Sequence, residues 1–144
     1  MIRIRPFRAT DEGPMIALWE ACGLVVAGND PSKDIARKCQ HDPELFLVGE
    51  VDGVLVASCM AGYEGHRGWI NYLAVYPGSQ RRGYASSLMK AAEQALRERG
   101  CPKINLQVRT SNRGVIAFYR ELGFAVDDVV SLGKRLVDDR VSAG

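Results

Sequence analysis

The sequence predicts an α+β domain in which a mixed β-sheet of about seven strands is flanked by four helices. Apolar runs bounded by turn residues alternate with segments whose apolar residues recur every three or four positions. Glycines follow the helical segments, and no repeat or linker divides the chain. We therefore expect a single domain over residues 1–144 with the order β-α-α-β-β-β-α-β-α-β-β.

The first part of the chain predicts one strand and two helices. Alternating apolar residues over 2–7 indicate the strand, and Thr10 or Asp11 caps a helix that Gly23 ends. A second, short helix begins at Pro31, where the missing N–H costs nothing. The apolar faces that we expect these helices to bury consist of Met15, Ile16, Leu18, Trp19, Cys22, Ile35, Ala36 and Cys39.

Three strands are predicted next. The apolar runs 45–51 and 54–61 flank Asp52-Gly53, which is a strong signal for an antiparallel hairpin. Residues 69–76 form the third strand, which stops at Pro77-Gly78.

The next element is a helix whose apolar residues recur very regularly along one face, and the remaining elements follow it. Residues 84–99 keep the spacing of one apolar helix face, and Gly100 supplies the stop. Residues 104–108 predict a strand, 112–122 a helix closed by glycine, and 124–137 a final pair of strands.

The turn between the strand at 69–76 and the helix at 84–99 has the features of an anion site. N–H groups at a helix start have no internal partner, and the helix dipole favours a negative charge there. Arg81 and Arg82 add positive charge, while Gly83 lets a ligand approach the backbone. A Walker loop is excluded because no lysine follows the glycine. The alternative for this turn alone is an ordinary helix start on a solvated face.

Two motifs together resemble the GNAT superfamily of N-acetyltransferases. Gln80, Gly83 and Ala85 fill the superfamily's Gln/Arg-x-x-Gly-x-Gly/Ala signature for acetyl-CoA. Asn112, with Tyr119 seven residues later, is similar to its Asn-to-Tyr helix, which ends on Leu122-Gly123-Phe124. The chain most resembles the YpeA-type bacterial acetyltransferases, a narrower likeness carried by residues 29–31, 62–68, 100–104 and 132–136.

The resemblance implies the GNAT fold and an acetyl-CoA-dependent transfer of an acetyl group to a primary amine, with no metal. It places the CoA pyrophosphate on the turn, the pantetheine arm beside the preceding strand, and the thioester near Tyr119. The cofactor-binding residues that it implies are Leu73, Ala74, Val75, Gln80, Arg81, Arg82, Gly83, Tyr84, Ala85, Ser86, Asn112 and Tyr119.

Direct acyl transfer needs an uncharged amine, a donor for the oxyanion and a proton for the departing thiolate. By the family's logic the N–H of Val75 or a neighbour is the donor, and the phenol of Tyr119 returns the proton. The general base is less clear, because Gln107 stands where some N-terminal peptide acetyltransferases have a glutamate. Glu64 and His66 are the remaining candidates, with solvated loop residues or a water relay as the alternatives.

The acceptor amine is expected over the first two helices. Trp19, Glu20, Asn29, Asp30 and Asp34 there predict a partly acidic, partly apolar rim. The sequence specifies neither the acceptor nor the acyl chain length.

Composition limits the other partners and the compartment. The chain has 19 basic and 17 acidic residues, a net charge of +2, which disfavours nucleic acid. No apolar run approaches the ~20 residues of a membrane span, so we expect no membrane partner. Four cysteines without a Cys-x-x-Cys pair are expected to be free thiols in a cytoplasmic protein. Whether the chain forms a homodimer stays open, as do two other hypotheses, a non-catalytic acyl-CoA-binding module and a nucleotide-binding domain.

Overall fold

The computed structural model describes residues 1–139, and its elements follow the predicted order as far as the last helix. Residues 140–144 of the expected domain lie outside the described residues. The strands and helices are β1 (Arg3–Pro6), α1 (Glu12–Ala21), α2 (Pro31–Lys38), β2 (Phe46–Val51), β3 (Val54–Tyr63), β4 (Gly68–Val75), α3 (Tyr84–Glu98), β5 (Ile104–Leu106) and α4 (Arg113–Glu121). The mixed α+β class is therefore confirmed.

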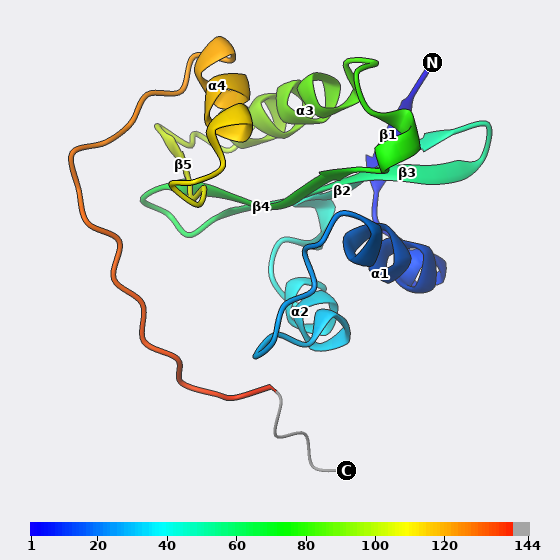
Figure 1. Cartoon of the computed structure of the whole chain (residues 1–144), viewed down its shortest axis with the longest axis horizontal. Helices are drawn as coiled ribbons and strands as arrows, with labels where there is room; N and C mark the ends of the chain where they lie inside the picture. Colours follow the sequence, from blue (N-terminus) through cyan, green and yellow to red (C-terminus); the bar gives the residue numbers. More distant parts are fainter. Residues whose placement is uncertain (140–144) are drawn as a thin grey trace.

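The five strands of residues 1–139 form one sheet in the order β1-β2-β3-β4-β5 (Figure 1). Neighbouring strands are antiparallel except β4 and β5, which are parallel. The predicted hairpin joins β2 to β3, with Val51 opposite Val54. Asp52 and Gly53 have φ values of 51° and 78°, the left-handed conformations that a tight two-residue hairpin requires.

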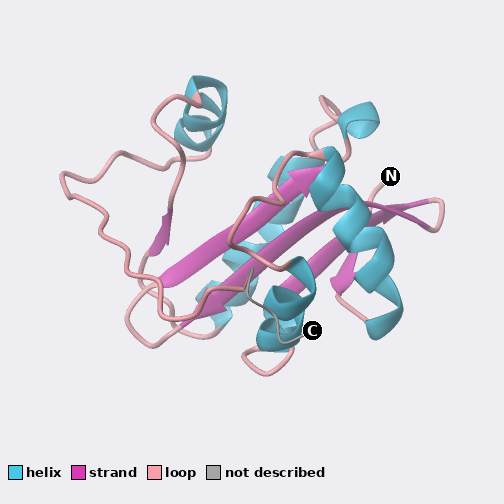
Figure 2. Cartoon of the chain, turned by 60° about the horizontal axis from the view of Figure 1, so that its bottom comes forward, coloured by secondary structure: helices cyan, strands magenta, loops and turns pink. Residues whose placement is uncertain are grey.

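Helices cover both faces of the sheet. Helices α1 and α2 lie on one face and α3 lies on the other, with α4 beside β5 (Figures 1 and 2). The core between α1 and the sheet contains Met15, Trp19 and Phe46. The core between α3 and the sheet contains Leu88 and Leu96. All five side chains have at most 1% of their surface exposed, so both layers are sealed from water.

A bulge in β4 opens the sheet between β4 and β5. Ser58 of β3 pairs with Ala74 and Met60 pairs with Asn71, so two residues of β4, Tyr72 and Leu73, oppose one residue of β3. Strand β5 pairs with β4 only over residues 68–70, so from 71 onward no strand of the described chain lies beside β4 on that side. The two parallel strands therefore separate into a cleft.

The predicted pair of strands at 124–137 is wrong. This segment, drawn orange to red in Figure 1, runs as an irregular extended chain from α4 round to α2. Side chains hold it, through contacts of Asp127 with Lys103 and of Asp139 with Arg37. Its valines and leucines have the β propensity that the prediction used, but a strand needs a partner and none of residues 1–139 pairs with it.

No helix within residues 1–139 is both long and apolar enough to span a membrane.

Candidate active site

Six consecutive N–H groups at the start of α3 are available to a ligand. The backbone amides of residues 81–86 donate to no acceptor within residues 1–139, and the first helical bond runs from the Ser87 N–H to the Gly83 carbonyl at 3.0 Å. Gly83 has φ 78° and Arg81 has φ 65°, so the chain passes twice through the left-handed region just before the helix. Successive left-handed and right-handed residues turn their N–H groups toward a common side, which is the geometry of an anion-binding nest.

Side chains fix this turn to the end of β4. The Gln80 amide donates to the Val75 carbonyl at 3.1 Å, and the Cys22 thiol donates to the same oxygen at 3.3 Å. The Gln80 side chain, expected to bind cofactor, thus ties the turn to the strand. Arg81 and Arg82 are exposed and make no ion pair with the described residues, so their charges remain free for a ligand.

The bulge at Tyr72 is held by a network that reaches α1 and α2. The Tyr72 ring stacks on Trp19 with 3.8 Å between ring centroids, and its hydroxyl donates to Asp34 at 2.6 Å. The Ser58 hydroxyl accepts from the Trp19 indole at 2.9 Å and donates to the Tyr72 carbonyl at 2.7 Å. These contacts offset the cost of a non-glycine residue at φ 50°. Burial, with Asp34 as the second cause, raises the pKa of Tyr72 above its ordinary value.

The separated strands enclose a cleft of about 780 Å³, which we call the inner cleft. Of the residues expected to bind the cofactor, Leu73, Asn112 and Tyr119 line it. Strand β4 lines this cleft with residues 70–73 and leads along the chain, through the short 3₁₀ helix at Pro77–Ser79, to the turn at 81–86. Asn112 caps α4, where its side-chain oxygen accepts from the Val115 N–H at 3.3 Å while the residue faces the cleft. The N-cap and ligand-binding interpretations of Asn112 are therefore compatible.

Tyr119 is a buried tyrosine whose hydroxyl has no partner within residues 1–139. Only 8% of the residue is exposed, and its ring packs edge-on against Phe118 and Phe124 with centroids 5.2 and 5.5 Å away. Burial, followed by the charge of Cys59, raises its pKa above the ordinary tyrosine value. The phenol therefore stays protonated at neutral pH and can act as a proton donor.

The structure does not bring Glu64 and His66 to the inner cleft. They lie in the loop before β4, at the end opposite the turn at 81–86. The Glu64 carboxylate accepts from the N–H groups of His66, at 2.7 Å, and of Arg67. These bonds, with Arg67 the larger cause, lower the pKa of Glu64, which makes it a weaker base.

Gln107 does line the inner cleft, and its side chain donates to the Ser131 hydroxyl. A glutamine cannot accept a proton, so this position supplies polarity without basicity.

The expected acceptor rim is only partly present. Asn29 and Asp34 line the inner cleft, whereas Trp19 is fully buried in the core. Asp30 caps α2 by accepting from the N–H groups of Ser32 and Lys33 at 3.0 and 3.3 Å.

The lining residues that escaped the sequence interpretation include Tyr72, Arg37 and Lys38. A Cβ added at Gly62 would lie 3.3 Å from the Lys38 ammonium, and burial lowers the pKa of Lys38.

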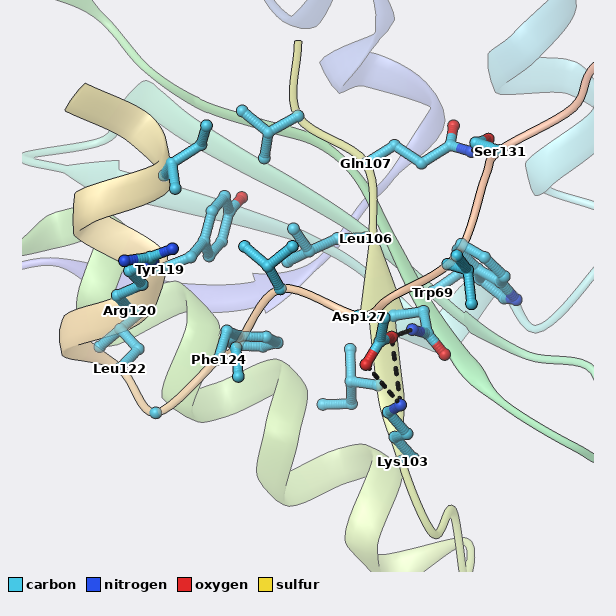
Figure 3. A pocket seen from close by; sticks show the side chains of 18 of the residues that line it. Trp69, Lys103, Leu106, Gln107, Tyr119, Arg120, Leu122, Phe124, Asp127 and Ser131 are labelled. Carbon is cyan, nitrogen blue, oxygen red and sulfur yellow. Dashed lines mark hydrogen bonds and ion pairs between the residues drawn. The ribbon is translucent and has the colours of Figure 1, made fainter. Parts of the chain in front are cut away.

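A second, outer cleft of about 1130 Å³ lies between β5, α4 and residues 124–131 (Figure 3). Tyr119 and Gln107 line both clefts, so they form part of the wall between them. Among residues 1–139 no group of three His, Cys, Asp or Glu side chains is placed to hold a metal ion.

Comparison with known proteins relates the sequence to acetyltransferases. Residues 12–124 match the Acetyltransferase (GNAT) family. An acetyltransferase of Pectobacterium atrosepticum is 50% identical over 96% of this chain and 99% of its own length. An acetyltransferase of Yersinia enterocolitica is 48% identical with the same coverage.

Solved structures share the fold. Ard1 from Thermoplasma volcanium superimposes with a TM-score of 0.75 and 25% identity, over 88% of this chain and 84% of its own. AAC(6')-Iy, solved with the bisubstrate analogue CoA-S-monomethyl-acetylneamine, superimposes with a TM-score of 0.77 and 20% identity, over 94% and 99%.

Proposed function

Because the chain belongs to the acetyltransferase (GNAT) family, we propose that it transfers an acetyl group from acetyl-CoA to a primary amine by direct attack in a ternary complex. The observation that carries the proposal is the row of unpaired N–H groups at 81–86, at the end of a strand whose free edge lines the inner cleft.

The cofactor is proposed to lie along β4. Its pyrophosphate accepts hydrogen bonds from the N–H groups of 81–86, where the dipole of α3 and the charges of Arg81 and Arg82 favour an anion. Its pantetheine arm runs beside Leu73, Ala74 and Val75, as an added half-strand on the free edge of β4. Asn112 then faces the sulfur end of the arm. In support, AAC(6')-Iy has this fold and was solved with a CoA-containing analogue.

The reaction requires three things: stabilisation of an oxyanion, a proton for the departing sulfur and removal of a proton from the amine. The amine nitrogen attacks the thioester carbon, and the oxyanion that forms accepts from the Val75 N–H or a neighbouring N–H of β4. The C–S bond then breaks, and the Tyr119 phenol gives its proton to the departing CoA sulfur.

The proton of the amine is proposed to leave through water. Asp34 is bonded to Tyr72 and lies 3.6 Å from the Arg37 guanidinium, so its carboxylate is already engaged. Glu64 is remote and bonded to backbone amides. Gln107 contributes polarity for orienting that water or the acceptor.

The test is an acceptor panel of small amines, peptides and proteins with acetyl-CoA, read out by thiol release and by the mass of the acetylated product. We expect amine-dependent thiol release with one product 42 Da heavier, about the mass of an acetyl group in place of a hydrogen. Thiol release that does not depend on the amine would contradict acyl transfer.

A non-catalytic acyl-CoA-binding module is the second candidate. The observation that favours it is that no uncommitted carboxylate of residues 1–139 lines the inner cleft. Tight CoA binding together with no transfer to any acceptor of the panel would select this alternative.

A further inference from the structure

Lys38, the last residue of α2, is a half-buried cation that lines the inner cleft. Its ammonium makes no hydrogen bond or ion pair within residues 1–139. The carboxylates of Asp42 and Glu44 favour its charged form, but both are bound by Arg99. A cation that is partly removed from water and unpaired carries a free-energy penalty, which a bound anion would remove.

The charges that line the inner cleft are mostly positive in the described chain. Arg37, Lys38 and Arg109 line it, against the carboxylate of Asp34. Arg37 is matched by Asp34 at 3.6 Å and by Asp139 at 2.8 Å. The charges of the cleft that no described residue pairs are therefore those of Lys38 and Arg109, and both are positive. This balance favours an anionic group and disfavours an additional cation.

Lys38 lies at the end of the cleft that the proposed cofactor leaves free. Its ammonium is 3.3 Å from the position that a Cβ at Gly62 would take, and Gly62 pairs with Trp69 near the start of β4. The pantetheine arm is proposed to lie at Leu73 to Val75, near the other end of this strand, with the pyrophosphate beyond it. The arm carries no charge, so the cofactor supplies no anion at the end where Lys38 lies.

Tyr119 and Lys38 reach the inner cleft from opposite sides. Helix α4, which carries Tyr119, and helix α2, which carries Lys38, lie on opposite faces of the sheet (Figure 1). Both residues line the cleft. An acceptor whose amine attacks a thioester near Tyr119 therefore directs the rest of its structure toward α2.

We propose, on the basis of the acetyl transfer proposed above, that the acceptor is a primary amine that also carries a carboxylate, and that Lys38 binds this carboxylate. Arg109 adds positive charge to the same cleft. The ion pair orients the amine toward the thioester, and the two cations repel acceptors with a second amine. Free amino acids and peptides with an acidic residue near the N-terminus both provide this chemistry.

A series of amino acids from glycine to 6-aminohexanoate tests the proposal, each compared with its amide and with the diamine of the same length. In the wild type, kcat/KM for the best amino acid should exceed that for its amide about tenfold or more, the usual effect of a hydrogen bond to a charged group. Its diamine should react more slowly still. The series also reports the distance between the amine and the carboxylate that fits the cleft.

Variants of α2 assign the preference to one side chain. Lys38→Met keeps an unbranched side chain without its charge and should reduce the ratio of amino acid to amide to within about threefold of one, whereas Lys38→Arg should keep most of it. Lys33→Met is the matched control, because Lys33 lies in the same helix but lines neither cleft, and it should keep the wild-type ratio. The basicity of each amine is the same for every protein, so comparing ratios removes its effect. Circular dichroism checks that each variant is folded.

Peptides distinguish the source of the carboxylate. Hexapeptides with Glu, Gln or Lys in second place have a free N-terminal amine and an amidated C-terminus, so they differ only in this side chain. A preference for the Glu peptide that is lost in Lys38→Met, with the free amino acids poor, assigns a peptide acceptor. The reverse pattern assigns a free amino acid, and either result supports the proposal.

Calorimetry of the CoA-bound protein with the same compounds separates this proposal from that of acetyl transfer. A preference for the carboxylate compounds that depends on Lys38, without any acetylated product, would support the binding role of Lys38 and contradict acetyl transfer. Acetyl transfer without such a preference, or with a preference that Lys38→Met retains, would overturn the role of Lys38 and leave acetyl transfer standing. Neither binding nor transfer of any carboxylate compound would overturn the proposal as well.

Discussion

At the scale of single residues, the two tyrosines of the inner cleft differ in what surrounds their hydroxyl groups. Tyr119 has a buried ring and a hydroxyl without a partner in the described chain, so its proton is available to a ligand. The Tyr72 hydroxyl donates to Asp34, and the residue shapes the strand instead. The sequence motif indicated the role that we propose for Tyr119, whereas no motif drew attention to Tyr72 in its apolar strand.

Replacing Tyr119 with phenylalanine is expected to lower kcat for acetyl transfer about 100-fold or more, the usual contribution of a general acid. The affinity for acetyl-CoA should stay within about threefold, because the ring keeps its packing against Phe124. Because burial raises the pKa of Tyr119, any loss of activity from ionisation of this phenol should occur above the ordinary value of about 10.

Stopped-flow or steady-state thiol release measures kcat, and calorimetry measures the affinity. Tyr63→Phe is the matched control, since the Tyr63 hydroxyl bonds to Gly65 outside both clefts. An unchanged kcat in Tyr119→Phe would remove its role as the acid.

Tyr72→Phe is expected to lower the free energy of unfolding by about 1–2 kcal/mol, because the Asp34 carboxylate loses its donor. Asp34→Asn keeps an acceptor oxygen for the Tyr72 hydroxyl and should cost less. Urea unfolding followed by circular dichroism measures both variants. Equal stability of Tyr72→Phe and the wild type would show that the bulge does not depend on this bond.

At the scale of elements, the sequence predicted the turns and helix starts that depend on neighbouring residues in the chain. Asp52-Gly53 makes the hairpin, and Asp30 with Pro31 starts α2, as their types and spacing indicated. Asp11 occupies the N-cap position of α1, but its carboxylate binds Arg5 of β1 instead of capping the helix. A sequence cannot reveal such a choice, because it depends on which strand lies nearby.

Asp11 links β1 to α1, and its replacement should reduce stability in a pH-dependent way. Its oxygens accept from two Arg5 nitrogens at 2.8 and 2.9 Å and from the Arg8 N–H at 2.8 Å, and only 7% of the residue is exposed. The bond from Arg5 is the main cause of its lowered pKa. A lowered folded-state pKa gives stability that is present above the unfolded value of about 3.9 and is lost as the pH falls through the folded value.

Asp11→Asn should therefore cost about 2 kcal/mol at pH 7, and its difference from the wild type should shrink on acidification below about pH 4. Urea unfolding across this pH range is the measurement. Asp52→Asn, in the exposed hairpin turn, is the control and should follow the wild-type curve. A constant difference between Asp11→Asn and the wild type at all pH values would contradict the ionic contribution.

At the scale of the whole molecule, the sequence predicted the fold class and the cofactor half of the proposed site, because both depend on local patterns. The turn at 81–86, Asn112 and Tyr119 follow from motifs, and in the structure Asn112 and Tyr119 line the inner cleft together with Leu73 of β4. The acceptor half depends on residues distant in sequence, such as Asp34 and Tyr72, and no local pattern brings those together. The strands expected at 124–137 failed for the same reason, since their partner is not encoded locally.

The central claim is that a CoA pyrophosphate binds the N–H groups at the start of α3, and calorimetry of acetyl-CoA with Gly83 variants tests it most directly. A Cβ at Gly83 would meet nothing within 4 Å, and both Asn and Asp tolerate its left-handed φ of 78°, so the two variants differ mainly in charge. We predict that the folded Gly83→Asn protein retains weakened binding, that Gly83→Asp shows no binding heat, and that ATP does not replace acetyl-CoA in the wild type. Gly83→Asp binding acetyl-CoA as tightly as the wild type would contradict the claim.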